Sequence, residues 1–115
     1  MTDHDLKEIF SNSFGTVYQS NRFNQYVLDF EGRISIFKAA DFFYFKKEVE
    51  AIDLEEMLQN TSRTSDVAIL MPHYTNTCFI LTASRVVKIK ELLQGAAFII
   101  KLNSMVNECL QVNLA

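Results

Sequence analysis

Residues 72 to 77, Pro-His-Tyr-Thr-Asn-Thr, gather the side chains best suited to chemistry in this chain. They place the imidazole of His73 beside the phenol of Tyr74, with hydroxyls and an amide close by. An imidazole can transfer a proton near neutral pH, so this segment could be the centre of an enzyme or the mouth of a ligand pocket. Proline, asparagine and threonine are also the residues that a hairpin turn uses for its backbone conformation. Both interpretations stay open, and no reaction can be named.

Other reactive side chains give weaker signals. The carboxylates between residues 48 and 56 share a polar face with lysines, as on a solvated helix, and His4 has no partner at metal-ligand spacing. Cys78 and Cys109 form neither a CxxC nor a Cys/His spacing, so we expect buried thiols without a disulfide or a zinc site. The chain has no GxSxG, P-loop, GxGxxG or HExxH motif. We therefore expect no metal and no cofactor, and the sequence favours a non-catalytic protein.

Composition limits the class of protein further. A chain of 115 residues fits one domain, residues 1–115, with a single core. A net charge of −3 with scattered lysines makes nucleic acid an unexpected partner, because clustered Lys and Arg supply most of that affinity. The first ten residues are acidic and no apolar run could span a bilayer, so we expect a cytoplasmic protein without membrane contact. Ten Phe without Trp predict a Phe-rich core or rings on a partner surface.

The first half of the chain predicts strands followed by helices. Leu6, Ile9 and Phe10 have the spacing of a short helical turn, whereas residues 15 to 37 alternate as three antiparallel strands joined at residues 20–23 and at Glu31-Gly32. From residue 38 the period becomes helical, with Phe42, Phe45, Val49 and Ile52 on one stripe. Asp53 could cap a second short helix, and residues 60–66 read as a loop.

The second half repeats this order. Residues 67–72 and 77–81 read as a hairpin, and Thr82 or Ser84 as the N-cap of a long helix. Residues 36–49 align with residues 80–93, with Phe37 on Leu81 at an offset of 81 − 37 = 44, which suggests repeat units 15–59 and 66–112; any two hairpin-helix units would also look alike. Gly95, inside the long helix, predicts either a close backbone approach or a break.

Apolar residues on the long helix form two overlapping stripes, which need two sets of neighbours. The second set could be the first helix or a second copy of the chain. Phe43 and Tyr44 lie off the core stripe of the first helix. We therefore expect a homodimer with Phe43, Tyr44, Ile99 and Val106 as contact candidates. The predicted fold is α+β: an antiparallel sheet of about five strands with two main helices on one face.

The order of apolar residues and turns from Gly15 to Phe37, followed by a helix, a hairpin and a long helix, resembles a family of short uncharacterised proteins from Bacteroidetes bacteria. The likeness spans about residues 15 to 100. Those relatives carry a CxxC pair in the knuckle between the first two strands, where this chain has Ser20 and Phe23. Neither side chain replaces a thiolate, so the resemblance implies a turn here, with Asn21 suited to positive φ and Phe23 free to pack. It implies a fold and no activity.

Three functions from different classes are compatible with these features. The first, which the sequence favours, is a small interaction or structural module that dimerises. The second is a small-ligand binding protein with a Phe-lined pocket between sheet and helices and with His73 or Tyr74 at its mouth. The third is an enzyme of unnamed reaction centred on the hairpin at residues 72–77.

Overall fold

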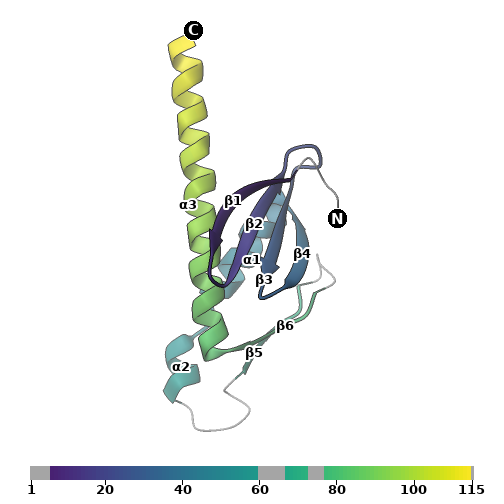
Figure 1. The fold of residues 1–115 in the computed structure, drawn as a ribbon. Coiled ribbons are helices and arrows are strands. Elements are labelled where there is room, and N and C mark those ends of the chain that lie inside the picture. Colours follow the sequence, from purple (N-terminus) through teal and green to yellow (C-terminus); the bar gives the residue numbers. More distant parts are fainter. Residues whose placement is uncertain (1–5, 60–66, 73–76, 115) are drawn as a thin grey trace.

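The computed structural model describes residues 6–59, 67–72 and 77–114, with side chains up to Leu110. Its main layer is a four-stranded antiparallel sheet of order β1-β2-β3-β4. The strands are β1 (Leu6–Asn12), β2 (Gly15–Ser20), β3 (Gln25–Phe30) and β4 (Arg33–Lys38). Helices α1 (Ala39–Glu50) and α3 (Ala83–Leu114) lie behind one face of this sheet (Figure 1). The α+β class and the helices on one face are as predicted.

The helical turn predicted for residues 5 to 10 is wrong, because residues from Leu6 onward form β1. This strand pairs with β2 along its length, and the register shifts between Glu8 and Phe10. The shift inserts Ile9 as an extra residue, so that Ile9 and Phe10 both pack against the core. The bulge removes the two-residue alternation by which a strand is recognised in a sequence.

The three strands predicted between residues 15 and 37 are present as β2, β3 and β4. The turn at Glu31-Gly32 has φ values of 52° and 84°, as a two-residue hairpin connection of this kind requires. On β4, Ser35 and Phe37 are buried, whereas Ile34 and Ile36 are exposed on the open face of the sheet. The exposed isoleucines follow from the register, which pairs Ser35 with the buried Leu28.

The first helix follows the predicted stripe. Phe42, Phe45 and Val49 of α1 are fully buried, and Ile52 packs at the edge of the core. Asp53 caps α2 (Leu54–Gln59), since its Oδ1 accepts a hydrogen bond of 3.0 Å from the backbone N–H of Glu56. The loop predicted at residues 60–66 lies outside the described residues.

The second hairpin forms a sheet of its own instead of a fifth strand. β5 (Val67–Leu70) pairs only with β6 (Phe79–Thr82) among the described strands. Two polar contacts hold the residues just before β6 to β4. Ser35 Oγ donates to Thr77 Oγ1 at 2.8 Å, and the Arg33 guanidinium donates to the carbonyl of Cys78 at 3.1 Å. The predicted single sheet of about five strands is therefore two sheets.

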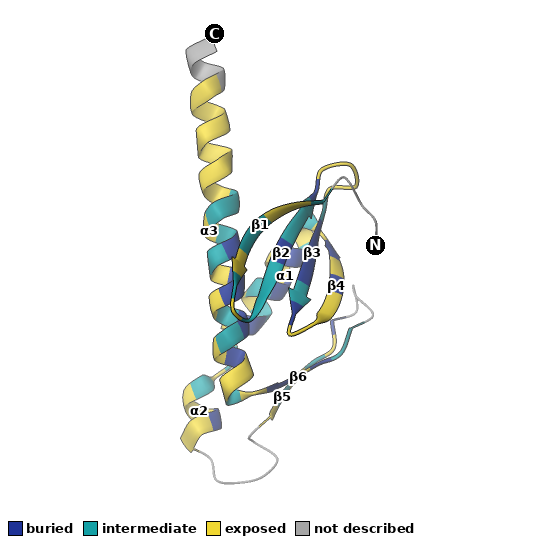
Figure 2. Ribbon diagram, in the orientation of Figure 1, coloured by how far each residue is buried: buried dark blue, intermediate teal, exposed yellow. Residues whose placement is uncertain are grey.

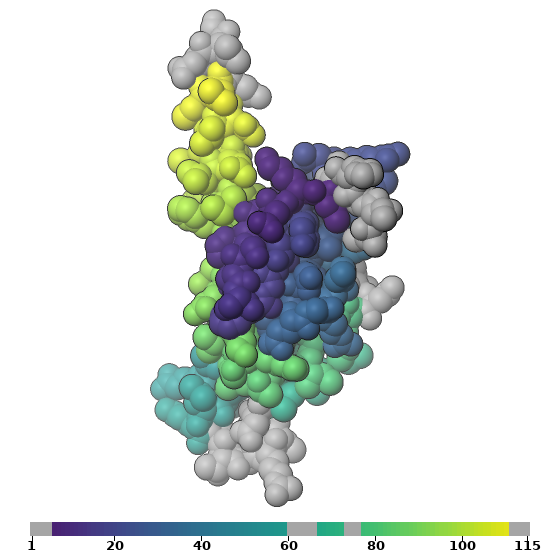
Figure 3. All heavy atoms as spheres, in the orientation of Figure 1, coloured from purple at the N-terminus to yellow at the C-terminus, as the bar shows by residue number. Residues whose placement is uncertain are grey.

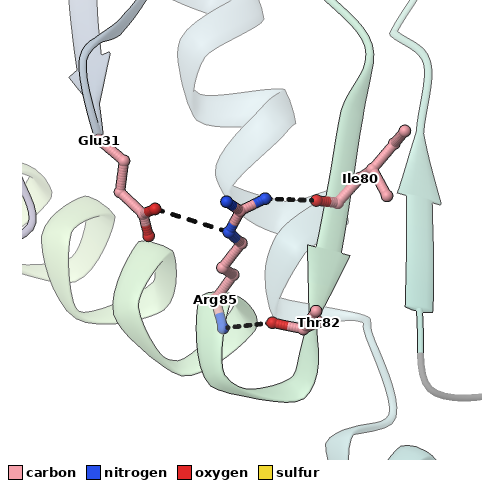
Figure 4. A network of polar contacts seen from close by, with 4 residues as sticks. All are labelled: Glu31, Ile80, Thr82 and Arg85. Carbon is pink, nitrogen blue, oxygen red and sulfur yellow. Dashed lines mark hydrogen bonds and ion pairs between the residues drawn. The ribbon is translucent and has the colours of Figure 1, made fainter.

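The long helix begins directly after β6. Thr82, one of the two predicted N-caps, accepts the backbone N–H of Arg85 on its Oγ1 at 3.3 Å. The Arg85 guanidinium then reaches the carbonyl of Ile80 and, at 3.5 Å, the carboxylate of Glu31 in the β3–β4 turn (Figure 4). These contacts tie the start of α3 to both sheets.

Phe rings fill the core, as the composition predicts. Phe37 stacks on Phe45 at a centroid distance of 5.0 Å, and Phe45 lies 4.7 Å from Phe79. The buried face of α3 completes the core with Val86, Ile89, Leu92, Leu93 and Ala96. Positions 44 residues apart, such as Phe45 and Ile89, are buried in both halves. The duplication itself stays a prediction.

Candidate functional site

The C-terminal part of α3 extends beyond the rest of the fold. Ile100 is the last described residue of the helix that packs against the core, and every residue from 101 to 110 is exposed (Figure 2). Figure 3 shows this part as a column that stands clear of the sheet. The radius of gyration is 16.0 Å, against about 13 Å for a compact domain of this length. We call residues 101–110 the projecting segment.

An apolar stripe lies on the side of α3 that faces away from the core. It consists of Phe98, Leu102, Met105 and Cys109, which we call the outer stripe. Because helix residues are about 100° apart, Phe98 lies almost opposite the buried Ala96. The exposed fractions are 65% for Phe98, 42% for Leu102 and 53% for Met105, and Cys109 is exposed. The spacing of four, three and four residues is that of one helix packing along another.

The side of the projecting segment that faces the fold is polar. Asn103, Ser104 and Asn107 line a cleft of about 460 Å³ between α3 and the end of the sheet that carries the knuckle. Across the cleft lie Lys7, Gln19, Asn21 and Tyr26. A helix that only docked on its own domain would have the opposite polarity, with apolar residues inward. The projecting segment therefore has its apolar side toward solvent and its amides toward its own fold.

The projecting segment has little to hold it helical. Asn103, Ser104, Val106 and Asn107 are weaker helix formers than Ala or Leu. Its two charged residues, Lys101 and Glu108, lie seven positions apart, too far for the ion pair that residues four apart can form. Short helices without tertiary contacts are marginal in water. A surface that packs on the outer stripe would stabilise this part of α3.

The knuckle is a turn. The positive φ, 51°, belongs to Asn24 and not to Asn21, which corrects the expected position. Phe23 does not pack on the core, because it is 56% exposed and lies under the guanidinium of Arg22, 5.3 Å from its ring centroid. The Asn24 carbonyl accepts a hydrogen bond from the Ala39 N–H, which joins the turn to the start of α1.

The predicted contact residues lie in two places. Phe43 and Tyr44 are exposed on α1, where the Phe43 and Tyr26 rings form a T-shaped pair with their centroids 5.9 Å apart. On α3, Ile99 is partly buried, and Val106 is exposed between the outer stripe and the cleft. The sequence reasoning missed Phe98, Leu102 and Met105, although their spacing with Cys109 could have revealed them. The prediction that Cys109 is buried is wrong, and Cys78 is partly exposed.

The predicted chemical sites remain without a test. His73 and Tyr74 lie outside the described residues. Of the residues that flank this part, Pro72 is buried and Thr77 accepts a hydrogen bond from Ser35. Between the sheets and the helices, where the sequence predicts a Phe-lined pocket, the rings of Phe37, Phe45 and Phe79 pack on one another. Ligand binding by these residues stays a prediction.

Burial raises the pKa of Tyr26 above its ordinary value of 10.0, since the charged phenolate would lose hydration. Within the described residues, no group of three or more His, Cys, Asp or Glu could hold a metal ion. The helices of the same part include none that combines the length and apolarity needed to cross a membrane.

Comparisons with family models, with curated proteins and with solved structures gave no match to this chain. The resemblance to the Bacteroidetes family is therefore a prediction without support from these comparisons.

Proposed function

We propose that this protein is a non-catalytic interaction module that forms a homodimer through the outer stripe of α3. The observation that carries the proposal is the polarity of the projecting segment, which turns its apolar side away from its own fold. Phe98, Leu102 and Met105 expose large apolar surfaces in a row. Covering such a side chain fully contributes about 1.5–3 kcal/mol. A partner that covers the row gains the part of this energy that corresponds to the area still exposed, and it also holds the projecting segment helical.

A second copy of the chain fits the outer stripe well. Two identical helices with a 4-3-4 spacing can pack along one another, since each side chain then lies between residues of the facing helix. A twofold arrangement uses the same stripe on both copies, so that no second surface is needed. Val106 borders the stripe and would lie at the edge of this contact.

The proposal is tested by sedimentation equilibrium of the wild type and two variants over a wide concentration range. The wild type is expected to show a reversible equilibrium between a 13.2 kDa monomer and its dimer. Leu102→Gln removes an apolar group from both copies and is expected to weaken association at least about tenfold. Leu58→Gln is the matched control, because Leu58 is an exposed leucine on α2. It is expected to leave association unchanged.

Two results would overturn the proposal. One is a wild type that stays monomeric at the highest concentration. The other is an equal effect of Leu102→Gln and Leu58→Gln, which would mean that the association does not depend on α3.

A further inference from the structure

We infer that the two copies of α3 pair antiparallel, with Lys101 of each copy beside Glu108 of the other. This inference rests on the proposed homodimer and specifies its geometry. Lys101 and Glu108 are the charged residues of the projecting segment, both exposed. At seven positions apart, they lie on the same flank of the outer stripe, one near each end. The opposite flank carries Val106.

Antiparallel pairing matches these side chains across the contact. With Leu102 facing Met105 of the partner subunit, Phe98 faces Cys109 of the partner subunit, and the same two layers recur on the other side of the twofold axis. The flank that carries the charges then lies beside the same flank of the other copy, as in antiparallel helix pairs. Lys101 meets Glu108 of the partner subunit, and the symmetry repeats this pair. Each dimer thus gains two pairs of opposite charge.

Parallel pairing in register loses these matches. Lys101 would lie across from Val106 of the partner subunit and not from a carboxylate. Seven residues before Phe98, the same side of α3 carries the exposed Glu91. In a parallel pair, this carboxylate would face Glu91 of the partner subunit, and the two like charges would repel each other. Antiparallel pairing leaves Glu91 outside the overlap.

The place where the sheets and α1 pack on α3 also favours antiparallel pairing. The sheets and α1 pack on α3 before residue 101, so an antiparallel overlap of projecting segments places the two folds at opposite ends of the contact (Figure 1). The overlap from Phe98 to Leu110 is about 20 Å long. A contact of this length is small compared with stable interfaces, which bury roughly 1,200–2,000 Å² of surface in total. We therefore expect a reversible dimer.

Charge reversal tests the pairing. In the Lys101→Glu variant and in the Glu108→Lys variant, the twofold symmetry brings two pairs of like charges together. Each variant is expected to raise the dissociation constant of the dimer about tenfold at low salt. The double variant restores opposite charges, and its dissociation constant is expected to lie within about threefold of the wild-type value. If the single variants leave a clear wild-type dimer unchanged, the antiparallel pairing is wrong while the homodimer stands. A wild type without any dimer overturns both.

Disulfide trapping tests the register independently. In the antiparallel pair, the two Cys109 residues are about 16 Å apart along the axis, whereas Phe98 lies opposite Cys109 of the partner subunit. In a Cys78→Ser background, Phe98→Cys is expected to give a covalent dimer when oxidised glutathione removes two electrons and two protons from the facing thiols. Cys78→Ser alone is expected to stay free of covalent dimer. If the Cys78→Ser control rapidly formed a disulfide between the two Cys109 residues, the pairing would be parallel and the inference would be overturned.

Discussion

The ring of Phe10 lies directly on the backbone of Gly95, so that the bulged strand β1 is seated on the middle of α3. A Cβ atom at position 95 would overlap the Phe10 ring. Of the two explanations that the sequence leaves for Gly95, a close approach or a break, the structure shows the close approach, because α3 continues through this residue. The contact lies within the supported part of α3, six positions before the projecting segment starts at residue 101.

Gly95→Ala is expected to destabilise the fold by about 1 kcal/mol, because the Phe10 ring must leave its position on the helix. Helix propensity alone predicts the opposite sign, a gain of about 1 kcal/mol. Denaturant unfolding of Gly95→Ala measures the net effect. In a Phe10→Ala background, the same substitution is expected to be stabilising. A gain in stability with Phe10 present would mean that the ring moves aside without cost.

Glu31→Asn is expected to stabilise the protein by about 0.5–1 kcal/mol, since asparagine tolerates the positive φ of this turn position better than glutamate. The substitution also removes the ion pair with Arg85, which is solvent-exposed and contributes little. Glu31→Gln is the control, because it removes the charge and keeps the backbone strain. The account is wrong here if both variants have the same thermal midpoint.

Thr82→Ala is expected to cost about 1 kcal/mol, because the first turn of α3 loses the side-chain oxygen that accepts the Arg85 N–H. Ser84→Ala provides the comparison, since Ser84 is an exposed residue inside the helix and not its cap. Urea titrations of both variants measure the difference. Equal stability of the two would show that the Thr82 hydrogen bond is not a stabilising cap.

Alkaline pH is expected to destabilise the protein partly through Tyr26. Burial raises the folded-state pKa of this phenol above 10.0, so the folded state retains its proton more strongly than the unfolded state. The contribution of the protonated Tyr26 phenol to the stability of the folded state is fully present below pH 10.0. It is lost as the pH rises through the folded-state pKa. Tyr26→Phe is expected to lose stability less steeply than the wild type above pH 10. Parallel pH profiles of the two proteins would contradict this role.

The sequence predicts the elements whose apolar spacing is regular. Phe42, Phe45 and Val49 determine the first helix, and the turn at Glu31-Gly32 determines the β3–β4 hairpin. It does not predict β1, because the bulge at Ile9 disrupts the alternation. It also misassigns Cys109, since periodicity shows that residues share a helix face but not where the domain beneath the helix ends. That boundary depends on tertiary packing around Ile100.

The most direct test of the central claim is hydrogen–deuterium exchange of the backbone amides of residues 101–110 at several protein concentrations. An unpartnered end of a helix opens easily and exchanges fast, whereas a paired helix is protected. The account predicts that protection of this segment rises with protein concentration, while that of the buried face of α3 near Leu92 does not change. Exchange of residues 101–110 that is fast and identical at every concentration would contradict the claim that the outer stripe joins two copies of the chain.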